Sequence, residues 1–241
     1  MAARDAVLLS QAIAVAGKDA IVLDLGSGTG STARAMTGEI CQNWTWRFVD
    51  GDAALLQHAH DKHPGSDCIV MNLRDIDELP LVGVSLVTAS ALLDLMPEDW
   101  ITNLACRLQD VAVPFYACLN YDGYMQWSPP LDTDTLITQD FNTHQCTDKG
   151  IGPAMGPQSG HRAAEILSDH GFDVTLSHSP WELDPRQAAL SDQLIAGIGA
   201  AAEEMGNPVA SDWVKKRSAD IARSTTVIGH TDLLAVPRKR D

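Results

Sequence analysis

Basic residues are scarce in this chain of 241 residues. Lys and Arg number 17 against 32 Asp and Glu, which gives a formal net charge of −15 at pH 7. Binding to nucleic acid or to an anionic membrane depends on basic surface. The charge balance therefore argues against both partners, and the basic stretch at 238–240 is too short to reverse it.

Long apolar runs and paired cysteines are also missing. No apolar run approaches the roughly 20 residues that a membrane-spanning helix needs, and the first residues lack the basic-then-apolar form of a signal peptide. We therefore expect a cytoplasmic protein. The five cysteines are odd in number and form no C-x-x-C pair, so we predict neither a disulfide framework nor a metal site. Cys68 and Cys118 lie in apolar, strand-like runs and are interpreted as small core residues.

The chain does contain a glycine-rich turn behind a short apolar segment. Residues 21–25 are typical of a buried strand, and Gly26, Gly28 and Gly30 follow at alternate positions before a helix-compatible stretch at 32–36. Such a turn brings backbone N–H groups close to a ligand. The spacing is G-x-G-x-G, with Asp24 two residues before the first glycine, and it differs from the G-x-G-x-x-G dinucleotide fingerprint.

This stretch resembles motif I of the class I S-adenosylmethionine-dependent methyltransferases, which has the form apolar-apolar-Asp-apolar-Gly-x-Gly-x-Gly. The resemblance implies that S-adenosylmethionine is the cofactor. It also implies that the turn holds this cofactor through Asp24, Gly26, Ser27, Gly28 and Gly30. The alternative is a plain tight turn in another nucleotide-fold protein.

Polar residues follow the next two expected strands. Asp50 ends the strand at 44–49 and lies 20 residues beyond Gly30. A carboxylate there can accept both ribose hydroxyls of an adenosine, with Gly51 beside it, although a turn acid is the alternative. Asp52 suits the N-cap of a helix at 53–62. In the resembled family the loop after the third strand, here 68–71, holds the adenine. That implies roles for Asn72, which replaces the usual acid, and for Leu73. Asp75 is the rival to Asn72, although 75–80 also suits a short acidic helical turn.

The fourth strand is expected at 84–90, and residues 86–96 resemble motif IV of the same family. The resemblance places Ser90 and Ala91 beside the methionine arm of the cofactor. Pro97 is expected as the first residue of a helix at 97–109, followed by a fifth strand at 111–120. A further amphipathic helix is expected at 5–16.

Five strands alternating with helices predict a doubly wound parallel sheet with right-handed crossovers. A strand at 174–177 and an antiparallel one at 227–236 match the ending of the resembled family. We therefore predict an α/β fold with a mostly parallel, seven-stranded sheet, helices on both faces and an antiparallel last strand. It forms a single domain over 1–241, with its core at 18–121 and 158–241.

Two insertions complete the predicted organisation. The alternating pattern breaks after residue 121, and 122–157 is interpreted as a cap that closes over the substrate and contains a helix at 132–145. Trp127, Tyr124 and Phe141 line an apolar pocket there or form the cap's own small core. A helical insertion at 185–224 holds two helices separated by 206–208, and a helix at 160–170 lies between the insertions.

Methyl transfer from a sulfonium is an in-line displacement, so catalysis consists mostly of positioning, and a base is needed only for a nucleophile that carries a proton. The candidates for that role are His144, Asp94 and Tyr121, although His144 also suits a surface histidine. We expect a small-molecule acceptor methylated on O, N or C, and a monomer or homodimer. The alternatives are an aminopropyltransferase-like enzyme and a nicotinamide-dependent oxidoreductase. The glycine spacing and the absence of a Tyr-x-x-x-Lys pair argue against the short-chain form of the latter.

Overall fold

The computed structural model describes residues 4–239 and contains one eight-stranded sheet in the order β3-β2-β1-β4-β5-β8-β6, with β7 also paired to β8. The strands are β1 (Ile21–Leu25), β2 (Thr45–Asp50), β3 (Asp67–Val70), β4 (Leu86–Ser90), β5 (Phe115–Ser128), β6 (Phe172–His178), β7 (Trp181–Leu183) and β8 (Thr225–Pro237). Strands β1 to β5 run parallel, and β8 pairs antiparallel with β5, β6 and β7. The predicted doubly wound α/β fold and its antiparallel last strand are confirmed.

The predicted count of seven strands is wrong by one. The additional strand is β7, in which Trp181 pairs with Ile228 and Leu183 with Thr226 of β8. Strand β7 has three residues, which is too short to show an alternating pattern. It can pair at the edge only because β8 is long enough to reach it. Only the pairing reveals it.

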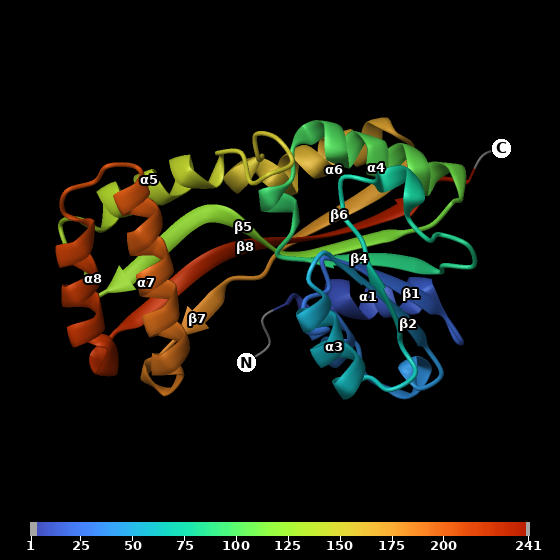
Figure 1. The fold of residues 1–241 in the computed structure, drawn as a ribbon, viewed down its shortest axis with the longest axis horizontal. Coiled ribbons are helices and arrows are strands. Elements are labelled where there is room, and N and C mark those ends of the chain that lie inside the picture. The colour runs from blue at the N-terminus through green and yellow to red at the C-terminus, as the bar shows by residue number, and fades with distance from the viewer. Residues whose placement is uncertain (1–3, 240–241) are drawn as a thin grey trace.

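Helices cover both faces of the sheet, as predicted (Figure 1). On one face, α1 (Ala6–Ala16), α2 (Ser31–Ala35) and α3 (Ala53–Lys62) pack on Val22, Phe48 and Leu86. On the other, α4 (Glu98–Asp110) and α6 (Ser159–Asp169) pack on Leu23 and Val87. Neighbouring strand residues point to opposite faces, so near-continuous apolar strands such as β1 serve two cores at once.

The predicted boundary between the sheet and the cap at residue 122 is wrong, because β5 extends beyond it. Strand β5 begins at Phe115, because Val111 is exposed and Ala112 has a φ of +53° in the turn after α4. It then continues to Ser128, with register shifts against β8 after Ala117 and after Tyr121. Those irregularities break the sequence pattern without ending the strand. Residues 122–128 therefore belong to the sheet and not to a separate cap.

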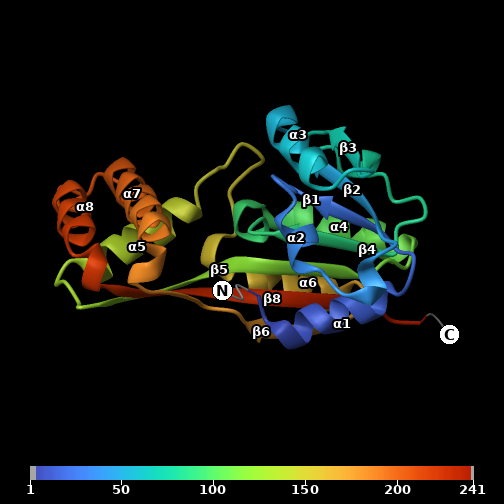
Figure 2. The same cartoon turned by 90° about the horizontal axis from the view of Figure 1, so that it is seen from below.

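The two predicted insertions form one helical lobe at the far end of β5 and β8 (Figures 1 and 2). It consists of α5 (Asp134–Gln145), α7 (Ala188–Glu204) and α8 (Ala210–Ala219). Its core contains Trp127 and Trp213, whose rings meet edge-to-face at 5.3 Å. Trp127 therefore belongs to the core of this lobe, and together with Tyr124 it also lines a cavity of about 500 Å³.

A buried ion pair closes this lobe. Arg217 is 1% exposed and bonds Asp134, and its guanidinium carbon lies 5.0 Å from the centre of the Trp127 ring. Trp213 Nε1 also donates to Asp134, at 2.8 Å. With two donors from the Arg217 guanidinium and the Leu131 N–H, four donors thus converge on one carboxylate, which satisfies a charge that would otherwise be costly to bury.

Local predictions were mostly correct, with three corrections. Asp52 caps α3, and its side chain accepts from the N–H groups of Ala54 and Leu55. Pro97 is the N-cap of α4, which begins at Glu98, and not the first helical residue. Cys118 is buried, but Cys68 is exposed because β3 is an edge strand, so its interpretation as a core residue is wrong. The remaining correction concerns β6, which is longer than predicted at both ends. Within the described residues, none of the helices combines the length and apolarity that crossing a membrane requires.

Candidate functional site

The glycine turn leaves β1 at the centre of the sheet. Gly26, Gly28 and Gly30 have φ angles of +58°, +53° and +77°, which side chains other than glycine rarely adopt. Ser27 N–H donates to the Val49 carbonyl of β2 at 3.1 Å, and Gly30 N–H donates to the Ser27 carbonyl at 2.9 Å. The turn is therefore held to the neighbouring strand, as expected of a turn that presents its backbone to a ligand.

Only one side of the turn is open. A Cβ placed on Gly28 would have no heavy atom within 4 Å, whereas one on Gly30 would meet His63 at 3.1 Å and Phe48 at 3.3 Å. A Cβ on Gly26 would lie 3.1 Å from Leu92, a residue that follows β4. A ligand can therefore approach at Gly28, with the Leu92 side chain as a neighbouring wall.

Asp50 lies at this open side. Its Oδ2 accepts from Gly28 N–H at 2.8 Å, and its Oδ1 accepts from Asp52 N–H at 2.9 Å. These two bonds fix the orientation of the carboxylate at the end of β2. Because each carboxylate oxygen can accept about two hydrogen bonds, both oxygens keep capacity for donors from a ligand.

A cavity of about 460 Å³ adjoins Asp50, and it is lined by Gly51, Val70, Met71, Asn72, Leu73 and Ile151. Asn72 Oδ1 accepts from Arg74 N–H at 3.0 Å, and Trp100 Nε1 donates to the Leu73 carbonyl at 2.6 Å, so the loop after β3 is held on both sides. The structure thus brings Gly51, Asn72 and Leu73 together as predicted. It adds Ile151, which the sequence did not indicate because its position depends on how the 146–158 loop folds back.

Asp24 is buried beneath the turn, with 1% of its surface exposed. The register of β1 with β4 pairs it with Thr88, whose hydroxyl donates to Asp24 Oδ1 at 2.7 Å. Its Oδ2 is buried without a partner among the described residues. Burial raises the pKa of Asp24 to about 6, while the Thr88 hydroxyl and the charge of Arg4 act in the opposite direction.

Arg4 is a site residue that sequence reasoning missed. Its Nε donates to Cys118 Sγ at 3.1 Å, and its Nη2 donates to Ser31 Oγ at 3.3 Å and to Ser90 Oγ at 3.1 Å. It precedes α1 in a stretch without any motif, so no local signal marked it. The predicted Ser90 and Ala91 do lie here: Ala91 has a φ of +51°, and its N–H donates to the Cys118 carbonyl at 2.9 Å.

Of the three catalytic candidates, Asp94 follows the end of β4, and Tyr121 lies within the neighbouring β5, at its second register shift. Asp94 is 7% exposed, and its Oδ1 has no partner among residues 4–239. Burial raises its pKa to about 6. Tyr121 donates its hydroxyl to Asn142 Oδ1 at 2.7 Å, and burial, with the nearby Asp122 and Asp94, raises its pKa.

His144 lies elsewhere, at the end of α5. Its Nε2 is 2.9 Å from Glu204 Oε2 of α7, and Lys149 Nζ is 3.3 Å from its Nδ1. These contacts join the helical lobe to the following loop. The turn at 148–152 is stabilised by Asp148, which accepts from Gly150 and Gly152 N–H groups. The structure therefore gives His144 partners in the lobe and none of the other predicted site residues.

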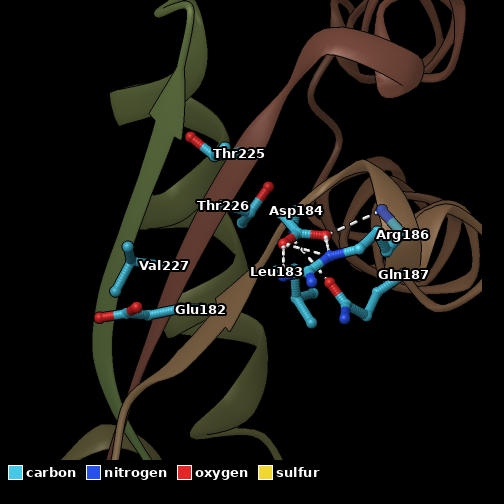
Figure 3. A pocket seen from close by; sticks show the side chains of 8 residues that line it. All are labelled: Glu182, Leu183, Asp184, Arg186, Gln187, Thr225, Thr226 and Val227. Atoms are coloured by element: carbon cyan, nitrogen blue, oxygen red, sulfur yellow. Dashed lines mark hydrogen bonds and ion pairs between the residues drawn. The ribbon is translucent and has the colours of Figure 1, made fainter. Parts of the chain in front are cut away.

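A second cavity, of about 650 Å³, lies where β7 and β8 meet the start of α7 (Figure 3). Arg186 donates to Asp184, and Gln187 Oε1 accepts from Asp184 N–H, while Glu182 lines the same cavity. It touches none of the predicted site residues. Among the described residues, no group of three or more His, Cys, Asp or Glu is placed to hold a metal ion.

No protein-family model matches the sequence, and neither does any curated protein. Solved structures do match. An inferred methyltransferase from Bacillus halodurans C-125 is 13% identical, with 98% of this chain and 99% of that one covered and a TM-score of 0.57. Geranyl diphosphate C-methyltransferase from Streptomyces coelicolor A3(2), solved with S-adenosyl-L-homocysteine, is 12% identical, with 97% and 79% covered and a TM-score of 0.50. The [4+2]-cyclase SpnF is 12% identical, with 97% and 80% covered and a TM-score of 0.52.

This chain therefore has the fold of the class I S-adenosylmethionine-dependent methyltransferases. At such low identities the likeness concerns the fold. Since a cyclase shares it, the fold by itself does not specify the reaction.

Proposed function

We propose that this protein is an S-adenosylmethionine-dependent methyltransferase that acts on a small molecule. The observation that carries the proposal is the position of Asp50, whose carboxylate bonds Gly28 N–H at the one open side of the glycine turn. The cavity beside it, at Gly51, Asn72 and Leu73, suits an adenine. An adenosine with its ribose on Asp50 would span both features.

The residues present fit this cofactor. Asp50 would accept the ribose hydroxyls, Leu73 and Ile151 would pack on the adenine, and Asn72 would meet its amine. The turn at Gly26, Ser27, Gly28 and Gly30 would face the methionine arm, with Ser90 and Ala91 on its other side. When bound, S-adenosylmethionine supplies a methyl group already activated by its sulfonium.

The protein's own contribution is then to orient the acceptor and to exclude water. Asp94 is the stronger candidate for taking a proton from the acceptor. Its pKa of about 6 leaves it ionised at neutral pH, and its Oδ1 is free of partners among residues 4–239. Tyr121 has a raised pKa and keeps its proton, so its role would be to position through the hydroxyl. His144 stays a weaker candidate because its partners are Glu204 and Lys149.

A small molecule is the favoured acceptor. The net charge of −15 opposes binding to nucleic acid. Structures of the same fold include enzymes named for small substrates, among them a phosphoethanolamine N-methyltransferase solved with phosphomonomethylethanolamine. The acceptor atom, O, N or C, is open, and so is a monomeric or homodimeric state.

Calorimetric titration tests the proposal. We expect the wild type to bind S-adenosylhomocysteine and not NAD(P). Asp50→Asn should weaken this binding by about 10- to 100-fold, because it removes a charged acceptor from the ribose hydroxyls. Asp52→Asn is the matched control two residues along, since Asn caps a helix as well as Asp does. The affinity of Asp52→Asn for S-adenosylhomocysteine should equal that of the wild type.

Three results would contradict the proposal. Binding of NAD(P) without S-adenosylhomocysteine would favour the oxidoreductase alternative. An unchanged affinity in Asp50→Asn would mean that the ribose binds elsewhere. Binding of decarboxylated S-adenosylmethionine in preference to the intact cofactor would favour the aminopropyltransferase-like alternative.

A further inference from the structure

Within residues 4–239 the sheet has several edges that meet no further strand, and they differ in how they are protected. Strand β3 has four residues and β7 has three. The part of β5 beyond its pairing with β4 has a register shift after Tyr121 and ends before Pro129 and Pro130. Short strands, bulges and prolines are devices by which proteins prevent edge-to-edge pairing.

Strand β6 is the edge without such protection. It is seven residues long, its register against β8 is continuous from Phe172 to His178, and it contains neither Pro nor Lys. No strand pairs with its other side among the described residues. A regular edge of this length is a template for a further strand.

The hydrogen bonds just beyond the two ends of β6 establish which of its backbone groups face outward. Arg238 N–H donates to the Gly171 carbonyl at 2.8 Å, and Ser179 N–H donates to the His230 carbonyl at 2.9 Å. The direction of bonding alternates from residue to residue along an antiparallel strand. The odd-numbered residues of β6 therefore bond β8, and the even-numbered ones face the open edge.

Val174 and Leu176 thus turn their N–H and C=O groups to this edge, where no group of the described residues bonds them. Their side chains are half-buried, and together with His161 and Glu165 of α6 they line a cavity of about 680 Å³. An added strand would bond the outward backbone groups and cover both apolar side chains. The edge and the cavity therefore favour the same kind of occupant, an extended chain.

The charges beside β6 suit a second copy of this chain. Each copy has a net charge of −15, so two copies repel unless the faces that meet are locally balanced. Two acids beside the edge have arginine partners: Glu165 Oε2 is 2.7 Å from Arg162 Nη1, and Asp173 Oδ1 is 2.9 Å from Arg238 Nε. Two copies can therefore approach through this edge with less repulsion than the net charge implies.

One antiparallel register pairs the whole strand with its own copy. With Thr175 on a two-fold axis, Val174 of each copy lies opposite Leu176 of the other, and Asp173 lies opposite Ser177. Val174 and Leu176 then form hydrogen-bonded pairs, as their outward backbone groups require. No two like charges face each other, and a pair of threonines meets at the centre, both of which favour strand pairing.

We propose that the β6 edge is the interface of a homodimer. Two copies pair β6 antiparallel about a two-fold axis at Thr175, so that the sheet continues from one protomer into the other. The α6 helices of both copies flank the new strand pair on the face that Val174 and Leu176 share. The inference does not rest on the proposed function, because β4, β5 and β8 separate β6 from β1 and its glycine turn.

Charge exchange at the two-fold axis tests the inference. Thr175 is exposed, and it is the one residue of β6 that lies opposite itself. Sedimentation equilibrium at successive protein concentrations should give the wild type twice the mass of one chain. Thr175→Lys and Thr175→Glu should each weaken the dimer by about 10-fold or more, because two like charges then face each other. An equal mixture of the two variants should associate within about 3-fold of the wild type, since opposite charges then meet.

Amide hydrogen exchange provides a second measurement. In the wild type the N–H groups of Val174 and Leu176 should be protected, because they donate to the other copy. In Thr175→Lys their exchange should accelerate by about 10-fold or more. The Asp173 N–H, which bonds β8, should stay protected in both proteins.

Val70→Lys is the matched control. Val70 is 61% exposed on the opposite edge strand, β3, so the same charge added there should change the dimer affinity by less than about 2-fold. A monomeric wild type overturns the inference, and so does a dimer that both Thr175 variants leave intact or that Val70→Lys disrupts instead. A mixture that stays monomeric overturns it as well, provided that both variants keep the circular dichroism spectrum of the wild type. If either loses it, Thr175→Arg and Thr175→Asp replace the pair and decide in the same way.

Discussion

Three buried aspartates differ in how completely their carboxylate oxygens are hydrogen-bonded. Asp232 accepts from Leu119 N–H, Asp5 N–H, Ser179 and Tyr116. Asp24 and Asp94 each keep one buried oxygen without a partner among residues 4–239. Satisfied buried acids stabilise a fold, whereas unsatisfied ones are typical of sites that meet a ligand.

Asp94 should make stability depend on pH. Its pKa in the folded protein, about 6, lies above the ordinary value of 3.8, so the folded state holds the proton more tightly than the unfolded state. The contribution of Asp94 is therefore fully present below about pH 4 and is lost as the pH rises through 6. Asp94→Asn removes this loss. The free energy of unfolding of the variant relative to the wild type should rise by about 3 kcal/mol between pH 4 and 7.

Urea unfolding at successive pH values measures this difference. A constant offset caused by the new amide does not affect it, because an amide does not titrate in this range. A flat difference for Asp94→Asn would contradict a raised pKa.

At the scale of elements, the irregular part of β5 around Leu119 is linked through Asp232 to the N-terminal segment. Leu119 has a φ of +57°, and the register against β8 shifts between Ala117 and Asn120. Asp232 accepts from Leu119 N–H at 2.8 Å and so pairs a backbone group that the shift leaves outside the ladder. The same carboxylate accepts from Asp5 N–H, so it also holds the segment that carries Arg4.

Asp232→Asn should destabilise the protein strongly. Its amide places a donor against donors from Leu119, Asp5 and Ser179 and removes a charged acceptor. We expect a loss of about 3–5 kcal/mol in the free energy of unfolding, measured in urea. Asp173→Asn, which alters an exposed pair with Arg238, should cost less than about 1 kcal/mol. An equally small cost for Asp232→Asn would show that the bulge does not need this acceptor.

On the scale of the whole molecule, the protein has two packing units that share long strands. The doubly wound sheet has a core on each face, and the helical lobe has its own around Trp127 and Trp213. The glycine turn and Asp50 belong to the sheet, while α5, α7 and α8 belong to the lobe. Separate cores allow one unit to loosen without the other.

Trp213→Ala should loosen the lobe selectively. Trp213 is 1% exposed, and its removal leaves a cavity and takes one hydrogen-bond donor away from Asp134, at a cost of about 3–5 kcal/mol. Amide hydrogen exchange should accelerate in α5, α7 and α8 but not in β1, β2 and β4. The affinity for S-adenosylhomocysteine should stay within about 2-fold. Leu136→Ala, an exposed position in the same lobe, should leave exchange unchanged, and uniform acceleration in Trp213→Ala would contradict two separate units.

Much of the fold and half of the site could be predicted from local sequence. The strand before Gly26, the glycine spacing, Asp50 and the helix at 53–62 depend on neighbours within a few residues, and each lies where predicted. The exact extent of β5 could not be predicted, since a bulge interrupts the alternating pattern while β8 continues the pairing. The chemistry of histidine favours His144 as a proton acceptor, but its position is determined by Glu204 of α7, far along the chain, and by Lys149.

The sequence by itself determined the order of the elements, the doubly wound sheet and the place of the glycine turn at the end of β1. These follow from periodicity, from glycine conformations and from charge, which act over short stretches of chain. Only the tertiary structure decided that the two insertions form one lobe, that Ile151 lines the cavity and that Arg4 enters the site. Each of these depends on contacts between residues that are distant in the chain, and packing rather than local preference selects such contacts.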